Sequence, residues 1–572
     1  MHGRLTVRYE ESMAGNILTP TTIWKDFNIS FIPSAKIEQE FCVGKKTYTK
    51  LYIDGQTIGE EKVEIFATLV KGSFKGKKPA ILLLQDFEYG FDDALVSALV
   101  DQGYVVLSID IAGQNEDNQH TVYPEQISYA NYKEVANKLF EVEGDVTETC
   151  WYEWVCATRH ALKYLVNLPF VSKVGGFGIG KSATVMWQVV ATDENVCCAT
   201  FALNAGWAGY KNIYKFSGKG EPHFSNNMYK YIAGIEPQSY AMHVKCPILM
   251  LSATNSDEYD CDRALDTVSR TAEGVFKATH YSVNYRNMVS GQAFENAILF
   301  FDEFLSNQAK GLVATSDISC EIVDGVIEVK VMTASEVKKV ELYASEEVYK
   351  PSERCWQLVC DGKKDKDGVY KFTYSPYHKS NQVTFFAQIY YKNKFVSSTK
   401  IINKKFEEKE VLPTHKTKIL YSSRLCFGES AFSSANQDLE DRRQINLDKE
   451  NRVQVKKGAK NIEGVCSKWG LLTFKFATKR DMPIDGSILM FDVCSKTQTN
   501  LTVKLISDYF GECVEYMANI KIIGGDIWQN VQIESNKFKT AEGLVLKTYE
   551  KINAMAFENS GEEFLLNNVL WV

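Results

Sequence analysis

Short apolar segments alternate with helical repeats between about residues 76 and 307. The apolar segments are nearly continuous, like strands of a parallel sheet buried on both faces, and cover 79–86, 103–113, 173–180, 196–204, 247–254 and 276–284. The segments between them carry apolar residues at helical spacing over 92–102, 148–168, 181–191, 262–272 and 291–307. This order predicts an α/β domain with a doubly wound sheet, which includes a strand-rich lead-in and covers residues 1–311.

Beyond residue 312 the apolar period changes to two, which is typical of strands. Short alternating segments joined by turns predict an immunoglobulin-like β-sandwich over 312–403. Residues 404–415 are rich in charge and predict a linker. The remainder, 416–572, is strand-rich again and predicts a second, larger all-β domain of jelly-roll size.

Composition narrows the class of protein. The 572 residues have a mass of 64.7 kDa, which suits three domains of these sizes. With 45% hydrophobic and 24% charged residues, the chain is not disordered over most of its length. The net charge is −7 and no long basic run occurs, so we expect no nucleic-acid partner. Neither a membrane-spanning apolar run nor a secretion signal is recognisable, so we expect a cytoplasmic protein without a membrane span.

The 14 cysteines contain no Cys-x-x-Cys pair, and Cys197 and Cys198 lie side by side in an apolar run. We therefore expect buried thiols in a reducing compartment rather than disulfides or a zinc ribbon. No group of His, Asp and Glu has metal-ligand spacing, and the acidic run at 257–262 is expected to be a solvated loop. The sequence predicts no metal and no cofactor.

The most informative segment is Gly175–Ser182, which matches the phosphate-binding pattern G-x-x-x-x-G-K-[ST] between a strand and a helix. A nucleotide-binding turn is therefore one alternative. Two long strands already precede this turn, however, and neither following strand ends in the aspartate that would hold magnesium. A tight strand–helix turn that needs glycine explains the same residues.

The second interpretation is a nucleophile elbow, in which G-x-S-x-G lifts a serine above the sheet. The corresponding residues are Gly176-Phe-Gly-Ile-Gly180, with Gly178 at the nucleophile position. Glycine has no side chain and cannot form an acyl-enzyme. Ser182 lies four residues later, where it is expected to cap or pack against the helix.

The chain from about 45 to 307 resembles the α/β-hydrolase superfamily, most closely its acetyl-xylan-esterase and dienelactone-hydrolase-like branch. Four segments carry the resemblance: Gly103–Gly113, Glu148–Ala161, Cys246–Asn255 and Phe300–Leu305. The resemblance implies a Ser–His–acid triad and an oxyanion loop. The chain departs from that pattern at most of these positions.

The loop that often begins His-Gly in this family reads Gln85-Asp86-Phe87, and the nucleophile position is Gly178. By the same resemblance, the acid corresponds to Asp257, or to Asp260 with a small shift. No histidine occurs between residues 284 and 290, where Asn287 takes the expected position. His280 lies earlier, within a predicted strand. Without a serine and a base to activate it, the acyl-transfer route is lost.

The tail resembles a carbohydrate-binding jelly roll through Ile523–Ile533, Phe538–Gly543 and Asn567–Trp571. The resemblance implies that Trp528 or Trp571 stacks on a sugar, although core positions are the more ordinary expectation for both. We therefore predict a catalytically degenerate hydrolase homologue that binds or scaffolds, with a carbohydrate or an acylated small molecule as ligand. The candidate ligand-binding residues are Gln85, Gly178, Ile179 and Trp528. An active carbohydrate esterase with a non-standard nucleophile and the nucleotide-binding turn remain alternatives.

Overall fold

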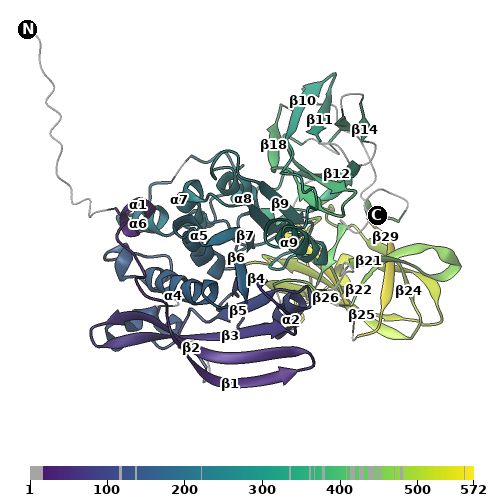
Figure 1. Cartoon of the computed structure of the whole chain (residues 1–572). Coiled ribbons are helices and arrows are strands. Elements are labelled where there is room, and N and C mark those ends of the chain that lie inside the picture. Colours follow the sequence, from purple (N-terminus) through teal and green to yellow (C-terminus); the bar gives the residue numbers. More distant parts are fainter. Residues whose placement is uncertain are drawn as a thin grey trace, which may run out of the picture.

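One sheet of nine strands runs through the first half of the chain in the order β1-β2-β3-β5-β4-β6-β7-β8-β9 (Figure 1). β1, β2, β3 and β5 pair antiparallel, whereas β5, β4, β6, β7, β8 and β9 are parallel. The strands are β1 Ala35–Val43, β2 Lys46–Ile58, β3 Glu61–Gly72, β4 Lys78–Leu84, β5 Val105–Ile109, β6 Val171–Ile179, β7 Val196–Ala202, β8 Ile248–Ala253 and β9 Lys277–Ser282. This mixed, mostly parallel sheet confirms the α/β part of the predicted fold.

The structure is a computed structural model of the whole chain. It describes residues 17–114, 119–135, 138–220, 222–333, 337–359, 362–365, 368–376, 380–407, 409–411, 419–423, 431–435, 444–447, 453–468, 470–476, 481–559 and 561–572.

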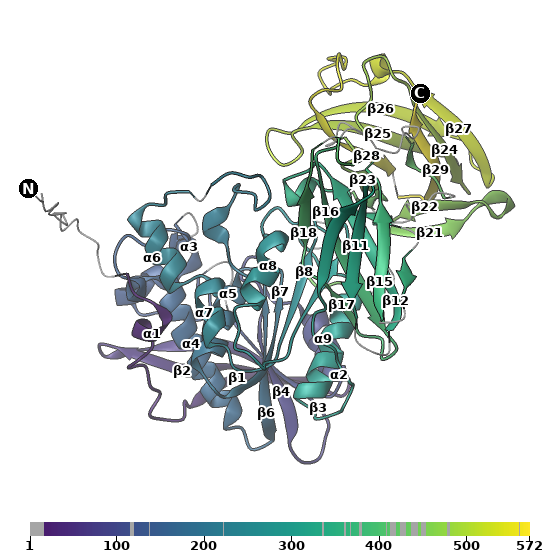
Figure 2. The same cartoon turned by 90° about the horizontal axis from the view of Figure 1, so that it is seen from above.

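Helices cover both faces of the sheet (Figure 2). α2 (Asp93–Asp101) and α9 (Gly291–Phe304) pack on one face, and α4 (Cys150–Val166), α5 (Ser182–Thr192) and α8 (Cys261–Val268) pack on the other. Side-chain caps at Asp92, Thr149 and Ser290 accept first-turn amides and fix where α2, α4 and α9 begin. Further helices and helical turns lie in the connections: α1 Pro20–Ile23, η1 Glu125–Ala130, α3 Tyr132–Val135, η2 Val146–Glu148, η3 Ala208–Tyr210, α6 Asn226–Gly234, α7 Pro237–Tyr240 and η4 Ala241–His243.

Residues 318–405 form two antiparallel sheets, one ordered β10-β11-β15-β14 and one ordered β13-β12-β16-β17 with β18 beside β16. Their inner faces meet in one buried cluster that includes Val329, Phe372, Leu342 and Phe385. That cluster continues to Phe301 on α9, so this middle region shares its core with the first. The elements are β10 Ile318–Val323, β11 Val326–Met332, β12 Val337–Glu346, η5 Pro351–Glu353, β13 Gln357–Val359, β14 Lys363–Lys364, β15 Val369–Tyr374, β16 Gln382–Tyr391, β17 Val396–Ser398 and β18 Ile402–Lys405.

The C-terminal region also consists of two antiparallel sheets, ordered β21-β22-β29-β24-β27 with β19 beside β29, and β20-β23-β28-β25-β26. Val493 and Leu566 from the first sheet pack against Val503 and Phe557 from the second. The elements are β19 Ile419–Tyr421, β20 Ser433–Ser434, β21 Val453–Lys457, η7 Ala459–Asn461, β22 Glu463–Ser467, β23 Leu471–Thr473, β24 Leu489–Ser495, β25 Thr499–Ser507, β26 Val514–Ile522, β27 Ile527–Ile533, η8 Ser535–Lys537, β28 Ile552–Asn559 and β29 Phe564–Trp571.

Both β regions contact the first region close to its last strand. The His280 ring lies 3.1 Å from the Val396 carbonyl through Nδ1, so β9 lies beside β17. From the C-terminal region, the backbone of Gln444 accepts a hydrogen bond from Val289 N at 2.9 Å. The neighbouring Ile445 is buried in the shared core.

All helices and strands predicted for 76–307 are present, with ends shifted by a few residues. The predicted linker is wrong at its start, because Lys404 and Lys405 belong to β18, which pairs with β16 behind the buried Ile401. Residues 408 and 412–415 of that linker lie outside the described residues. The domain bounds and the immunoglobulin-like and jelly-roll identities stay predictions. In the described part of the chain, no helix has the length and apolar character needed to cross a bilayer.

Candidate functional site

Five loops meet at the carboxyl edge of the parallel strands, where open α/β sheets place their ligand sites. Each follows one strand directly, so the side chains come from distant parts of the sequence. The loops span residues 85–92, 180–181, 203–210, 254–260 and 283–290.

The turn after β6 has its left-handed position at Gly180 (φ 55°), not at Gly178. Gly178 lies within the strand, paired with Leu84 and Phe201. A Cβ there would lie 2.6 Å from Met186 Cβ, so this glycine lets α5 approach the sheet. The turn therefore lies two residues beyond Gly178, the predicted elbow position, because the strand continues to Ile179 before the chain turns.

The space over Gly180 is filled by Asp86, from the loop after β4. A Cβ built on Gly180 would collide with Asp86 Oδ2. That oxygen accepts hydrogen bonds from Lys181 N at 3.0 Å, Gln444 Nε2 at 3.1 Å and the Tyr259 hydroxyl at 3.3 Å. The Asp86 side chain is buried, and burial raises the pKa of its carboxyl group although the Lys181 ammonium opposes the shift. An internal carboxylate thus occupies the place where an elbow would carry its nucleophile.

The Lys181 side chain forms the charged rim of this turn. Its ammonium pairs with Glu88 and lies 3.6 Å from Glu258. Burial alone would lower the pKa of Lys181, but the two carboxylates raise it overall. The Tyr132 hydroxyl donates to Glu88 and extends the same network. The cation is therefore already matched by protein carboxylates.

The predicted acid and the residue in the histidine position do lie together. Asn287 Nδ2 donates to Asp257 Oδ1 at 3.1 Å, and Asn287 Oδ1 accepts from Ser256 Oγ at 2.8 Å. Because an amide is not a base at neutral pH, this arrangement orients polar groups without being able to take a proton.

Two other candidates are engaged elsewhere. Asp260 caps α8 and pairs with Arg263 at 2.6 Å, so it belongs to the helix start. His280 is buried in β9, where burial lowers its pKa to about 4. Asp260 lines the cavity, although its carboxylate is held by the start of α8 and by Arg263. His280 is not among the described residues that line the cavity.

The candidate ligand residues Gln85 and Ile179 make contacts inside the protein. Gln85 Nε2 donates to Ser108 Oγ at 3.1 Å, and its amide oxygen accepts from Asp92 N at the start of α2. Ile179 is buried in the core. Neither is among the described residues that line the adjacent cavity.

The phosphate-loop alternative is contradicted by the backbone. Gly175 to Gly178 pair with β4, and Gly176 to Ile179 also pair with β7. Amides that are committed to the sheet cannot surround a phosphate. Only Gly180 and Lys181 form the turn itself, and the backbone amide of Lys181 donates to the Asp86 carboxylate.

A cavity of about 200 Å³ lies beside the turn. One wall is aromatic, because the Tyr231 ring contacts those of Phe140 and Trp151, with centroid distances of 5.6 and 6.4 Å. Trp207 and Tyr210 form a second aromatic wall. The polar lining consists of Lys181, Thr184, Asn204, Lys211, Asn212, Ser256, Asp257, Glu258, Asp260, Lys350 and Ser352. Apolar walls with a few polar groups are the usual composition of a small-molecule site.

The loop that carries Trp207 is held in an uncommon conformation. Trp207 has φ 69°, which costs free energy for a bulky residue and persists only where its surroundings impose it. The fully buried Glu236 accepts from Gly209 N at 2.8 Å, and Gln238 accepts from Trp207 N at 3.2 Å. The Trp207 indole donates to Thr267 at 2.8 Å. The polar core beneath the loop therefore fixes an aromatic side chain at the cavity.

In the C-terminal region, Trp528 is half-buried in β27 and donates through Nε1 to the Ala459 carbonyl at 3.1 Å. Its ring covers Gly464, where an added Cβ would lie 2.7 Å from Trp528 Cη2. Trp571 is buried in the core between the two sheets. Both indoles thus pack within the region, and a sugar-stacking role for Trp528 stays a prediction.

Sequence reasoning missed Asp86, Gln444, the Trp207 loop and the lining from residues 350–352. Asp86 follows Gln85 directly in the sequence. An acidic residue in the loop that corresponds to an oxyanion loop, together with glycine at the turn, could have predicted that a carboxylate fills the space over the turn. Trp207 and Lys350 line the cavity from loops that are far apart in the sequence, so no local sequence pattern indicates that they lie together. Among the described residues, no His, Cys, Asp or Glu group has the arrangement of a metal site.

No protein-family model and no curated protein matches the sequence. Among solved structures, the chain is similar to acetyl xylan esterase 1 from Thermoanaerobacterium sp., at 14% identity and TM-score 0.33 over 45% of this chain and 83% of that one. An acetyl xylan esterase from Paenibacillus sp. R4 matches at 10% identity and TM-score 0.37 over 50% and 92%. A glucuronoyl esterase from Teredinibacter turnerae matches at 11% and 0.30 over 45% and 74%. These similarities cover about half of this chain, at 10–14% identity and TM-scores of 0.30–0.37.

Proposed function

We propose that the chain is a catalytically inactive hydrolase homologue that binds a carbohydrate or an acylated small molecule in the cavity beside Gly180. The observation that supports this most directly is Asp86, which occupies the nucleophile's place and binds the Lys181 amide. In an active elbow, the amide after the nucleophile stabilises the oxyanion of the transition state. A carboxylate on that donor excludes the oxyanion by occupancy and by charge.

The base is missing as well as the nucleophile. Asn287 lies against Asp257 where the resemblance places a histidine, and it cannot accept the proton of an attacking group. Neither histidine nor cysteine is among the described residues that line the cavity. An esterase with a substitute nucleophile therefore finds no activated side chain there.

The cavity, in contrast, keeps the properties of a binding site. Aromatic walls suit the apolar face of a ring, and the mixed donors and acceptors suit hydroxyl or carbonyl groups. Its volume of about 200 Å³ is below the roughly 300–1,000 Å³ of drug-sized sites, which favours a small ligand.

The proposal is tested by measuring hydrolysis and binding separately. With 4-nitrophenyl acetate we expect no release of nitrophenol above the uncatalysed rate. With 4-nitrophenyl glycosides, which pair an aromatic ring with a neutral sugar, we expect saturable binding by calorimetry. Tyr210→Ala removes a cavity wall and should weaken binding at least tenfold, whereas Tyr229→Ala, an exposed tyrosine outside the cavity, should not. Hydrolysis that Tyr210→Ala abolishes would contradict the proposal.

A further inference from the structure

Two of the described residues that line the cavity are tryptophans, and they differ in exposure. Trp151 is 2% exposed and its indole donates to the Leu139 carbonyl at 2.8 Å, so it belongs to the core. Trp207 is only half-buried in the same lining. A half-buried indole beside a cavity presents a large apolar surface that a ligand can cover.

The backbone of Trp207 is held in one unusual conformation. Its φ of 69° lies in the left-handed region, which bulky residues rarely adopt. Backbone strain of this kind clusters at ligand sites, where it holds a side chain in a prearranged position. Here Gln238 accepts from Trp207 N at 3.2 Å, and the buried Glu236 accepts from Gly209 N at 2.8 Å. The position of this side chain is therefore fixed before any ligand arrives.

One face of α8 supports the Trp207 ring. Arg263, Thr267 and Arg270 follow one another at helical spacing, so they share a face of the helix and of the turn after it. The Thr267 hydroxyl accepts from the indole Nε1 at 2.8 Å. The guanidinium carbons of Arg263 and Arg270 lie 5.7 and 5.0 Å from the ring centre. These three side chains fix the orientation of the ring as well as its position.

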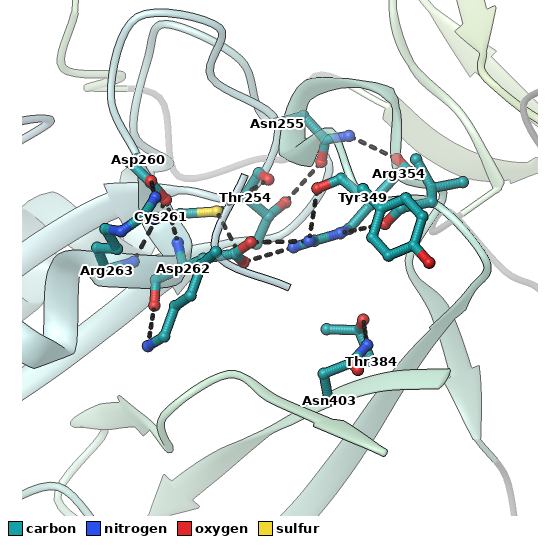
Figure 3. Close-up of polar contacts among 12 residues, drawn as sticks. Thr254, Asn255, Asp260, Cys261, Asp262, Arg263, Tyr349, Arg354, Thr384 and Asn403 are labelled. Atoms are coloured by element: carbon teal, nitrogen blue, oxygen red, sulfur yellow. Dashed lines mark hydrogen bonds and ion pairs between the residues drawn. The ribbon is translucent and has the colours of Figure 1, made fainter. Parts of the chain in front are cut away.

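The start of α8 is anchored by two ion pairs (Figure 3). Asp260 caps the helix and pairs with Arg263 at 2.6 Å. Asp262 binds both terminal guanidinium nitrogens of Arg354, with Nη2 2.7 Å from Oδ2. Arg354 also donates to two carbonyls of its own loop, at 348–349, both at 3.1 Å. The helix that supports Trp207 is therefore held by the first and middle regions together.

The charges around the ring favour a neutral ligand. Among the described residues, the lining carries three lysines, at 181, 211 and 350, and three acidic residues, at 257, 258 and 260, so neither charge is in excess. Two guanidinium groups already lie against the Trp207 ring. A cationic ligand on the same ring would therefore meet like charge.

We infer that Trp207 is the stacking platform of the cavity, on which a neutral six-membered ring of the ligand lies, and that Thr267 is a positioning residue that orients it. The inference rests on the proposed function, because it names the side chain that recognises the ligand in that cavity. Stacking uses the whole face of the indole, so it selects a flat ring rather than a charge. The ring can be a pyranose or an aromatic ring, and the probes below separate the two.

The test uses ¹⁹F NMR on the full chain labelled with 5-fluorotryptophan, with resonances assigned by single tryptophan-to-phenylalanine variants. We expect 4-nitrophenyl β-D-glucopyranoside to shift the Trp207 resonance. Trp528, the other half-buried tryptophan among the described residues, does not line the cavity and should shift less. Methyl β-D-glucopyranoside and 4-nitrobenzyl alcohol carry one ring each, and the one that reproduces the shift at saturation identifies the stacked ring. A shift that neither reproduces would contradict stacking.

Two variants separate stacking from positioning. Trp207→Ala should weaken glucoside binding about tenfold, whereas Tyr229→Ala, an exposed aromatic residue outside the cavity, should not. Thr267→Val keeps the side-chain volume but removes the indole's acceptor. It should weaken binding about threefold and move the Trp207 resonance of the free protein. Thr271→Val is the matched control, because its buried hydroxyl donates to the Val268 carbonyl, and it should change neither.

The outcomes distinguish this inference from the proposed function. If the full chain binds none of the probes, both fail. If the glucoside binds and Tyr210→Ala weakens it, while Trp207→Ala and the Trp207 resonance show no effect, the proposed function stands and this inference is wrong. A larger shift at Trp528 would place the ligand in the C-terminal region and overturn both. Tighter binding of benzyltrimethylammonium or of 4-nitrophenyl β-D-glucuronide than of the glucoside would overturn the neutral ligand.

Discussion

The turn at Gly180 and the cavity beside it share Lys181, yet the first is filled by a protein side chain and the second is open. At the turn, the Lys181 amide, Gln444 and Tyr259 all bind the Asp86 carboxylate, so protein atoms fill the space over Gly180. In the cavity, the same lysine's side chain borders aromatic walls and other polar side chains. Under the proposed function, catalysis and recognition depend on separate side chains, so that one can be lost while the other is kept.

The two places also differ in what holds them. The turn is closed by a residue of the adjacent loop and by Gln444 from the C-terminal region. The cavity is open because the Trp207 loop and the 348–354 loop are fixed at its edges by buried polar groups, Glu236 and Asp262. Substitutions that remove either kind of support therefore test this difference between the turn and the cavity.

The largest effect is expected at Arg354, which anchors the loop that brings residues 350–352 to the cavity. Arg354→Met leaves Asp262 buried and uncompensated, and should lower the free energy of unfolding by about 3–5 kcal/mol in urea denaturation. The same change should reduce glycoside binding, because residues 350–352 lose their anchor. A stability within experimental error of the parent chain would show that the pair does not support this wall.

Two controls sharpen that result. Glu321→Gln breaks the exposed Lys330–Glu321 pair of the same region and should have no measurable effect. The double change Arg354→Met with Asp262→Met should recover much of the stability, because no unpaired buried charge remains.

A smaller effect is expected at the turn. Gly180→Ala introduces a Cβ at a left-handed position and against Asp86, so we expect a loss of about 2–4 kcal/mol in the free energy of unfolding. Gly90→Ala is the matched control: its φ is also positive, at 75°, but a Cβ there meets nothing within 4 Å. It should cost only the backbone term, about 1–2 kcal/mol.

The difference in unfolding free energy between Gly180→Ala and Gly90→Ala measures how tightly Asp86 packs against the turn. Adding Asp86→Ala to Gly180→Ala should bring the cost of the alanine down towards that of Gly90→Ala. Equal costs for both glycines without that second change would mean that Asp86 moves aside freely, and the contrast between a sealed turn and an open cavity would fail.

The sequence was most informative where one segment carries its own pattern. Continuous apolar strands and amphipathic helices predicted the parallel part of the sheet, and the glycines around 176–180 predicted a strand–helix turn. The pairing of Asp257 with Asn287 could also be anticipated, because both follow neighbouring parallel strands. The position of the turn was missed by two residues, since glycine permits both a close helix contact at Gly178 and a left-handed turn at Gly180.

What could not be anticipated depends on contacts between distant segments. Gln444 reaches Asp86 across 358 positions of sequence, and Arg354 reaches Asp262 across 92. Neither residue has a local pattern that distinguishes it from a surface side chain. Arginine and glutamine are mostly found at protein surfaces, so only the tertiary structure shows that Arg354 and Gln444 are buried and which residues they bind.

The smallest effect concerns Glu236, which supports the aromatic loop of the cavity. Burial raises the pKa of its carboxyl group from 4.5 to about 7, although backbone amides of the loop oppose the shift. Between these values the folded chain keeps a proton that the unfolded chain has released. Stability from this group is therefore full below pH 4.5 and is lost as the pH rises towards 7, at up to about 1 kcal/mol per pH unit.

Glu236→Gln removes this titration while keeping an oxygen for Gly209 N. We expect the free energy of unfolding of the variant, relative to the parent chain, to rise by about 1–2 kcal/mol between pH 5 and pH 8. Asp110 and Glu153 titrate in both proteins and cancel in that difference. Glycoside binding measured alongside should lose part of its pH dependence, because the loop under Trp207 would no longer rest on an ionising group. A difference that stays constant over this range would show that Glu236 keeps one protonation state, and that the loop is held in the same way at every pH.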